Sequence, residues 1–240
     1  MQYFNLLAIL YALGFSALLF SRLRVRPTFA SFFGGLGLGL FGLSLVAETA
    51  LAYDFNETWL KLWYFCFPLL ALYGHGLLAL YLPRKYYKLL TIGLGLGVLA
   101  SAALIALTRI TQAVDWYDPT LSVQLQYGDV LARNRPTRYL TWLFQAYALG
   151  AGLVTLGFSL AAIRQKKQTR SSLFGPLSVI AGVALVFTRG ITYTAYGETI
   201  FYIVQLIIPM LLFWGFQHTF KRYGTPNQEM MLKATGREAA

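Results

Sequence analysis

The stretch FASFFGGLGLGLFGLSLVAETALAY, residues 29–53, decides the class of fold. Glu48 is its only charged residue. A helix of about 20 apolar residues crosses the hydrocarbon core of a bilayer. The stretch therefore predicts a membrane-spanning helix.

Six further apolar runs accompany this stretch and leave no room for a soluble domain. They lie at residues 2–20, 59–82, 89–111, 139–163, 172–195 and 199–220. Only 12% of the residues are charged, against about 25% in soluble domains. No cleavage site for a signal peptide follows the first run, so we expect it to be retained. The sequence predicts an all-α membrane protein, with one seven-helix domain over residues 1–220 and a cytoplasmic tail over residues 221–240.

The charged residues predict the orientation of these helices. With the N-terminus outside, 14 of the 20 basic residues fall on the inner side, and seven of the nine acidic residues fall on the outer side. Lysine and arginine are enriched in cytoplasmic loops. We therefore expect the N-terminus outside and the C-terminus inside a bacterial inner membrane. The net charge of +11 then reflects topology and contacts with anionic lipid heads, and not a nucleic-acid site.

The chain aligns weakly with itself. The tetrapeptide LGFS occurs at Leu13–Ser16 and again at Leu156–Ser159. Placing Pro68 on Pro209 also places Gly34 on Gly175 and Gly74 on Gly215. This pattern predicts a repeat over residues 1–85 and 139–220, with the run 89–111 as connector and an outer loop over residues 112–138. Because three helices and a connector restore the direction of the chain, both copies would point the same way. Shared composition of apolar helices is the alternative explanation.

Two resemblances follow from these residues. Trp63-Tyr64, Gly74-x-Gly76 and the run Leu80–Lys85, LYLPRK, resemble uncharacterised bacterial seven-helix membrane proteins. The 3+1+3 plan is similar to that of SWEET-type sugar transporters and microbial rhodopsins. A rhodopsin needs a lysine within its last helix, and residues 199–220 contain none, so we expect no retinal.

Glycines and prolines punctuate the apolar runs. Gly35 and Gly39 have a small-xxx-small spacing, which lets helix backbones approach in lipid. We expect such glycines to serve internal packing or, alternatively, docking of another membrane subunit. Pro68 and Pro209 lie within predicted helices, where proline removes a hydrogen bond and kinks the helix. They are candidate hinges or inherited features of shape.

Ionisable residues inside a bilayer are costly and are candidates for function. Glu48 aligns with Arg189 under the same shift, and Arg109 lies near the outer end of the run 89–111. We expect a buried contact between Glu48 and Arg189, shared with Arg109, that serves as a structural clamp or a ligand site; side chains that snorkel to the membrane surface without a partner are the alternative. The residues of the candidate pocket beside it are polar or aromatic: Tyr53, Thr188, Thr192, Tyr193 and Tyr196.

His75 lies between Gly74 and Gly76, which leave room around its ring. A hydrogen-bonded packing histidine is our main interpretation, and an axial ligand to haem or chlorophyll is the alternative. Cys66 is the only cysteine, so neither an intramolecular disulfide nor a cysteine-based zinc site can form. No motif for a catalytic residue or a metal site occurs, and we expect no enzyme activity.

These observations favour a protein that binds or transports a small solute in an outward-facing cavity between the repeats. An accessory subunit of a larger membrane complex is the main alternative, with glycine-rich helices as docking surfaces. A seven-helix sensor that acts through a separate partner is the third.

Overall fold

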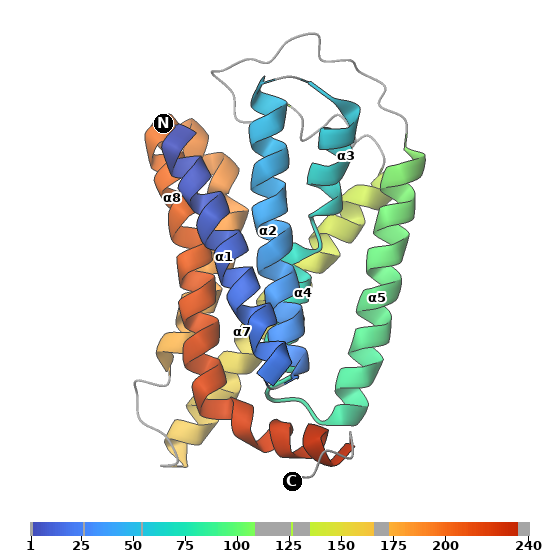
Figure 1. The fold of residues 1–240 in the computed structure, drawn as a ribbon, viewed down its shortest axis with the longest axis vertical. Helices are drawn as coiled ribbons and strands as arrows, with labels where there is room; N and C mark the ends of the chain where they lie inside the picture. Colours follow the sequence, from blue (N-terminus) through green and yellow to red (C-terminus); the bar gives the residue numbers. More distant parts are fainter. Residues whose placement is uncertain are drawn as a thin grey trace.

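The computed structural model describes residues 2–25, 27–53, 55–108, 126, 135–165 and 173–234; within these it leaves out the side chains of residues 2–3, 135–138, 189–196, 198 and 220–234. Helices account for nearly all of this part of the chain, and it contains no strand. The helices, arranged as in Figure 1, are α1 (Gln2–Val25), α2 (Phe29–Tyr53), α3 (Glu57–Phe65), α4 (Leu69–Leu78), α5 (Arg84–Leu107), α7 (Arg135–Arg164) and α8 (Phe174–Ala234). The predicted all-α class is confirmed.

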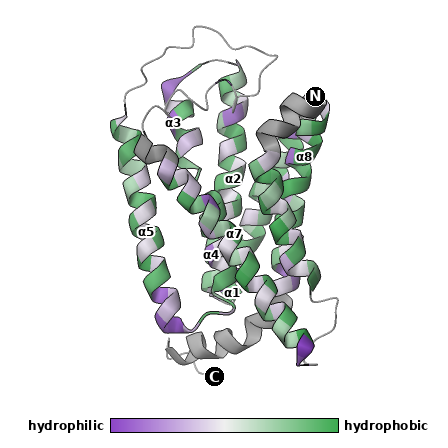
Figure 2. Ribbon diagram, turned by 180° about the vertical axis from the view of Figure 1, so that it is seen from behind, coloured by the Kyte–Doolittle hydropathy of each residue, from purple (hydrophilic) through white to green (hydrophobic). Residues whose placement is uncertain are grey.

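Five helical segments are long and apolar enough to cross a membrane. They are Phe4–Val25, Phe29–Tyr53, Arg84–Leu107, Tyr139–Arg164 and Thr199–Thr219. Figure 2 shows apolar residues along these helices and polar residues gathered towards their ends. The prediction of a helical membrane protein is therefore supported for five of the seven predicted spans. The other two differ from expectation: the run 59–82 is divided into two helices, and 172–195 contains the shorter apolar segment Phe174–Thr188.

The division between α3 and α4 lies at Pro68. Because proline has no N–H, it cannot complete the α-helical bond to the carbonyl oxygen of Tyr64. The N–H of Phe67 donates to this oxygen instead, over 3.0 Å, and the N–H of Leu69 donates to Cys66 over the same distance. These bonds join residues three positions apart, as in a 3₁₀-helix. The predicted kink at Pro68 is thus a short 3₁₀ segment between two separate helices.

The reversal within α8 lies at Gly197, whose φ of 78° and ψ of 179° interrupt the helical dihedral angles. Only glycine adopts this region without strain. The segments on its two sides pack against each other, because a Cβ atom at Gly182 would lie 2.9 Å from Leu212. Residues 174–196 and 198–234 therefore form a helical hairpin. Pro209 lies in the second segment, whose backbone stays helical around it.

The centre of the bundle is α4, and all ten of its residues are buried. It contacts α2, α5, α7 and α8, as its position between these helices in Figure 1 indicates. A helix that is apolar on every side is typical of such a buried position. Its contact with α2 is close: a Cβ atom at Gly37 would lie 2.6 Å from the Cβ atom of Tyr73, and one at Gly76 would lie 2.7 Å from the backbone nitrogen of Gly34.

The predicted glycine contacts divide into two groups. Gly35 and Gly39 face α1, where the Ser16 hydroxyl donates to the Gly35 carbonyl oxygen over 2.7 Å. In α5 and α7, by contrast, a Cβ atom at Gly93, Gly95 or Gly150 would meet nothing within 4 Å. The first group serves internal packing, whereas the second faces outward.

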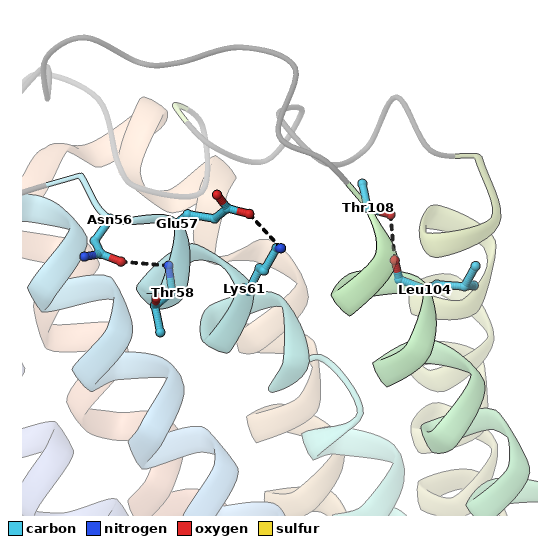
Figure 3. Close-up of polar contacts among 6 residues, drawn as sticks. All are labelled: Asn56, Glu57, Thr58, Lys61, Leu104 and Thr108. Atoms are coloured by element: carbon cyan, nitrogen blue, oxygen red, sulfur yellow. Dashed lines mark hydrogen bonds and ion pairs between the residues drawn. The ribbon is translucent and has the colours of Figure 1, made fainter.

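The start of α3 and the end of α5 lie at the same end of the molecule, as Figure 3 shows. Asn56 caps α3 by accepting a hydrogen bond of 2.7 Å from the N–H of Thr58, and Glu57 forms an ion pair of 2.6 Å with Lys61. Such caps satisfy amides that a helix start leaves free. At the end of α5, the Thr108 hydroxyl donates to the Leu104 carbonyl oxygen. Polar groups thus mark where two neighbouring helices reach this end.

Candidate functional site

Glu48 lies in α2 with only 5% of its surface exposed. Its carboxylate oxygen Oε1 accepts a hydrogen bond of 3.1 Å from Nε2 of Gln205, which belongs to the second segment of α8. Gln205 is fully buried. The contact therefore joins the N-terminal and C-terminal parts of the chain through a buried charged group, and such groups in membrane proteins are candidates for function.

A second amide side chain reaches the adjacent residue of α2. Asn5 of α1 donates from Nδ2 to the hydroxyl oxygen of Thr49 over 2.6 Å. The hydroxyl of Thr49 donates in turn to the carbonyl oxygen of Leu45 over 2.7 Å. Since that hydroxyl has only one hydrogen, it must accept from Asn5, which fixes the orientation of the Asn5 amide.

The two amides therefore present their oxygen atoms without a donor. Among the residues that the structure describes, no hydrogen bond reaches Oδ1 of Asn5 or Oε1 of Gln205, although both atoms are buried. Gln205 cannot turn its amide round without aiming its oxygen at the Glu48 carboxylate. A buried acceptor without a donor costs about 1–3 kcal/mol. The cluster formed by Asn5, Glu48, Thr49 and Gln205, which we call the α1–α2–α8 polar cluster, is thus rich in acceptors.

Pro209 adds a further acceptor at this place. It follows Gln205 by four residues in a helical segment, so its missing N–H is the one that would bond the Gln205 carbonyl oxygen. In membrane helices such oxygens are satisfied by neighbouring helices, side chains or water. Gln205 therefore contributes a side-chain oxygen and a backbone oxygen at the same level of the bundle.

Several predicted site residues lie outside the described residues. Arg109 is among them, and so are the side chains of Arg189, Thr192, Tyr193 and Tyr196. The predicted contact between Glu48 and Arg189 stays a prediction. Gln205 is one partner of Glu48.

Two residues of the predicted pocket are exposed. Tyr53 is 68% exposed because it ends α2, so its ring does not line a buried site. Thr188 is exposed, and its hydroxyl lies 3.1 Å from the carbonyl oxygen of Ala184 in its own helix. Hydroxyl groups of helical threonines commonly turn back in this way, which the sequence interpretation of a pocket did not take into account.

His75 has hydrogen bonds at both ring nitrogens. Nδ1 lies 2.6 Å from the Tyr147 hydroxyl of α7, and Nε2 lies 2.8 Å from the Thr91 hydroxyl of α5. Thr91 donates its only hydroxyl hydrogen to the Tyr87 carbonyl oxygen over 2.8 Å. It must therefore accept from Nε2–H, and Tyr147 donates to Nδ1.

The ring of His75 is also enclosed. It stacks on Tyr87 with centroids 4.3 Å apart and meets the edge of Phe33 at 4.7 Å. An axial bond to haem or chlorophyll would have to displace one of the two hydrogen bonds. The geometry fits the main interpretation of a packing histidine, here one that joins α4 to α5 and α7.

The sequence interpretation missed Asn5 and Gln205. It weighed ionisable residues in the apolar runs and passed over neutral amides, although an amide inside a bilayer also needs partners. The spacing of Gln205 and Pro209 was a readable signal, because it combines a polar side chain with a carbonyl oxygen that loses its helical donor.

The chain was compared with known protein families, curated proteins and solved structures. No protein-family model, curated protein or solved structure matches the chain. Function therefore has to be argued from the site.

Proposed function

We propose that the protein binds or transports a small solute with hydrogen-bond donors, such as an amine or a hydroxylated compound, at the α1–α2–α8 polar cluster. The observation that carries this proposal is a pair of buried acceptors: Oε1 of Gln205, whose amide bonds Glu48, and Oδ1 of Asn5, whose amide bonds the next residue of α2, Thr49. Ligand sites combine apolar walls with a few placed polar groups. A solute that donates N–H or O–H bonds would satisfy the oxygens that the described residues leave open.

The distribution of charge supports a site near the outer surface. Glu48 lies in the half of α2 that leads to the end where α3 begins. Four basic residues of the described chain, Arg22, Arg24, Arg84 and Lys85, lie at the opposite end of the helices. Under the positive-inside rule, this arrangement supports seven spans with the N-terminus outside and a solute that enters from outside.

Close glycine contacts support the proposal that the solute lies between two copies of a three-span unit. In the first half, a Cβ atom at Gly76 would lie 2.7 Å from the nitrogen of Gly34. In the second half, one at Gly215 would lie 2.9 Å from the oxygen of Gly175, which aligns with Gly34. Each half packs its second and third helices through glycine, but at different positions of the third helix, because Gly215 aligns with Gly74 and not with Gly76.

A thermal-shift experiment on the purified full chain in detergent tests the proposed site. The probes are sodium chloride, ammonium chloride, ethanolamine, glycine, glycerol and glucose, each compared at constant ionic strength. We expect at least one donor-bearing probe to raise the unfolding temperature of the wild type, because a ligand at 100 times its Kd stabilises by about 2.7 kcal/mol.

Two variants locate that effect. Glu48→Gln and Gln205→Leu should each reduce the ligand-induced shift, and the matched control Gln217→Leu should retain it, because Gln217 lies 12 residues further along the same helix, about 18 Å away. A probe that stabilises the wild type and both site variants equally would contradict the proposal.

A second candidate function, an accessory subunit of a membrane complex, rests on the outward side of α5. Of its 24 residues, only Tyr87, Leu94, Ser101 and Ile105 are buried. The open faces of Gly93 and Gly95 would let another helix approach closely. Extraction in mild detergent followed by mass spectrometry would detect a partner, and Gly93→Leu should release it.

A further inference from the structure

The end of α1 and the end of the apolar segment Thr199–Thr219 of α8 meet through a pair of polar side chains that the solute proposal does not use. Arg22 lies in the last turn of α1, and its Nη1 donates to Oε1 of Gln217 over 2.6 Å. Above this pair, Phe15 and Phe213 stack with centroids 4.0 Å apart. The two helices are therefore held together beside the polar pair.

Arg22 fixes the orientation of the Gln217 amide. A guanidinium group has donors and no acceptor, so the amide oxygen must face it and Nε2 must face away. Gln217 is 6% exposed, and no acceptor within the described part of the chain bonds its Nε2. A buried amide donor without an acceptor costs about 1–3 kcal/mol, so the place favours an acceptor from outside the chain.

The charge of Arg22 points to the same kind of ligand. The amide oxygen of Gln217 is neutral and leaves the positive charge in place. Among the described residues, the one ion pair is that of Lys61 with Glu57, at the other end of the molecule. Arg22 therefore has no carboxylate partner in that part of the chain, and four of its five donors are left for a ligand.

We propose that Arg22 and Gln217 bind the phosphate group of an anionic ligand. Phosphate supplies both a negative charge for the guanidinium group and acceptor oxygens for Nε2 of Gln217, and arginine binds phosphate in this way. Arg22 lies three residues before the end of the apolar segment Phe4–Val25, and the ends of membrane-spanning helices are where lipid headgroups lie. Anionic lipid of the cytoplasmic leaflet and free phosphate are the two sources of such a group.

Lipid binding to the full chain distinguishes this site from general attraction to basic residues. Binding of phosphatidylglycerol, relative to phosphatidylcholine, is measured by native mass spectrometry in mixed micelles. We expect Arg22→Gln and Gln217→Glu each to weaken phosphatidylglycerol binding about tenfold, which corresponds to one charge-assisted contact. Gln217→Glu replaces the amide donor with a carboxylate that neutralises Arg22.

The controls separate loss of binding from loss of folding. Gln217→Glu should unfold at a temperature at least as high as the wild type in lipid-free detergent, because an ion pair replaces the neutral contact. Arg24→Gln removes the same charge from an exposed neighbour in the last turn of α1 and should change binding by no more than about twofold, since exposed charges contribute little.

A second arm tests free phosphate. Inorganic phosphate replaces chloride at constant ionic strength, and the unfolding temperature is measured for the wild type and Gln217→Glu. Stabilisation of the wild type alone would support the site with phosphate ion as its ligand, whereas a tenfold lipid effect would support the lipid headgroup. The proposal is overturned if Gln217→Glu changes neither measurement, or if Arg24→Gln weakens lipid binding as much as Arg22→Gln.

Discussion

Pro68 and Pro209 align with each other in the predicted repeat, yet the chain around them differs. At Pro68 the helix ends, and a 3₁₀ segment separates α3 from α4. At Pro209 the helix continues, and its backbone angles stay helical. The same residue therefore divides one helix and is accommodated in the other.

The neighbours of each proline account for the difference. Before Pro68, the rings of Trp63 and Tyr64 lie 5.2 Å and 4.9 Å from that of Phe67. This aromatic cluster holds Phe67 where its N–H bonds the Tyr64 carbonyl oxygen. Before Pro209 the chain reads Ile207-Ile208, without such a cluster. Proline removes a donor in both cases, and the packing around it decides whether the helix breaks.

The consequence for polar groups differs as well. In the first half, the oxygen that Pro68 releases is bonded again within the chain. In the second half, Pro209 releases the carbonyl oxygen of Gln205, whose side chain contacts Glu48. One proline shapes the packing of α4, and the other contributes an acceptor to the α1–α2–α8 polar cluster.

The largest expected effect concerns the close packing of α2 against α4, the helix that begins after Pro68. Gly37→Ala should lower the free energy of unfolding by about 3 kcal/mol, because its Cβ atom would lie 2.6 Å from Tyr73 and 2.8 Å from the carbonyl oxygen of Leu69, and overpacking costs about 1–3 kcal/mol. Unfolding by SDS in mixed micelles measures this. Gly93→Ala is the control and should be neutral or slightly stabilising. Equal effects would show that the contact of α2 with α4 is loose.

Replacing each of the two prolines with alanine should change the free energy of unfolding in opposite directions. Pro209→Ala should stabilise the protein by about 2 kcal/mol, because alanine restores the helical bond to Gln205 and proline costs up to about 3 kcal/mol in a helix. Pro68→Ala should destabilise it by about 1 kcal/mol, because the unfolded chain gains freedom while the break is retained. The same SDS titration compares them, and a shared sign would refute the contrast.

The smallest expected change in stability concerns the residues seven positions after each proline, His75 and Phe216. His75 aligns with Phe216, and both are fully buried, but only the first half uses a polar side chain there. Tyr147→Phe removes the donor to Nδ1 of His75 and should cost about 1 kcal/mol. Tyr139→Phe, which alters an exposed ring of the same helix, should cost nothing measurable. Hydrogen exchange in α5 should rise in Tyr147→Phe if His75 anchors that helix.

The sequence allowed the membrane class and five of the spans to be predicted, because a long apolar run without charge has few other solutions. It also singled out Glu48, since a carboxylate within such a run needs a reason. It predicted a kink at Pro68 but not the division into two helices, because an apolar run has the same composition in an α-helix and in a 3₁₀ segment. Nor did it reveal Gln205, because a neutral amide in an apolar run attracts less notice than a charge.

The complete burial of α4 has a consequence for how this sequence can change. Hydropathy reports that a segment avoids water, but it does not report whether lipid or protein surrounds it. The ten residues of α4 have protein on every side, whereas α5 turns most of its surface outward. Substitutions in α5 need mainly to keep the side chain hydrophobic, whereas substitutions in α4 must also keep its volume. A lipophilic photoreactive label should accordingly mark α5 and leave α4 unmarked.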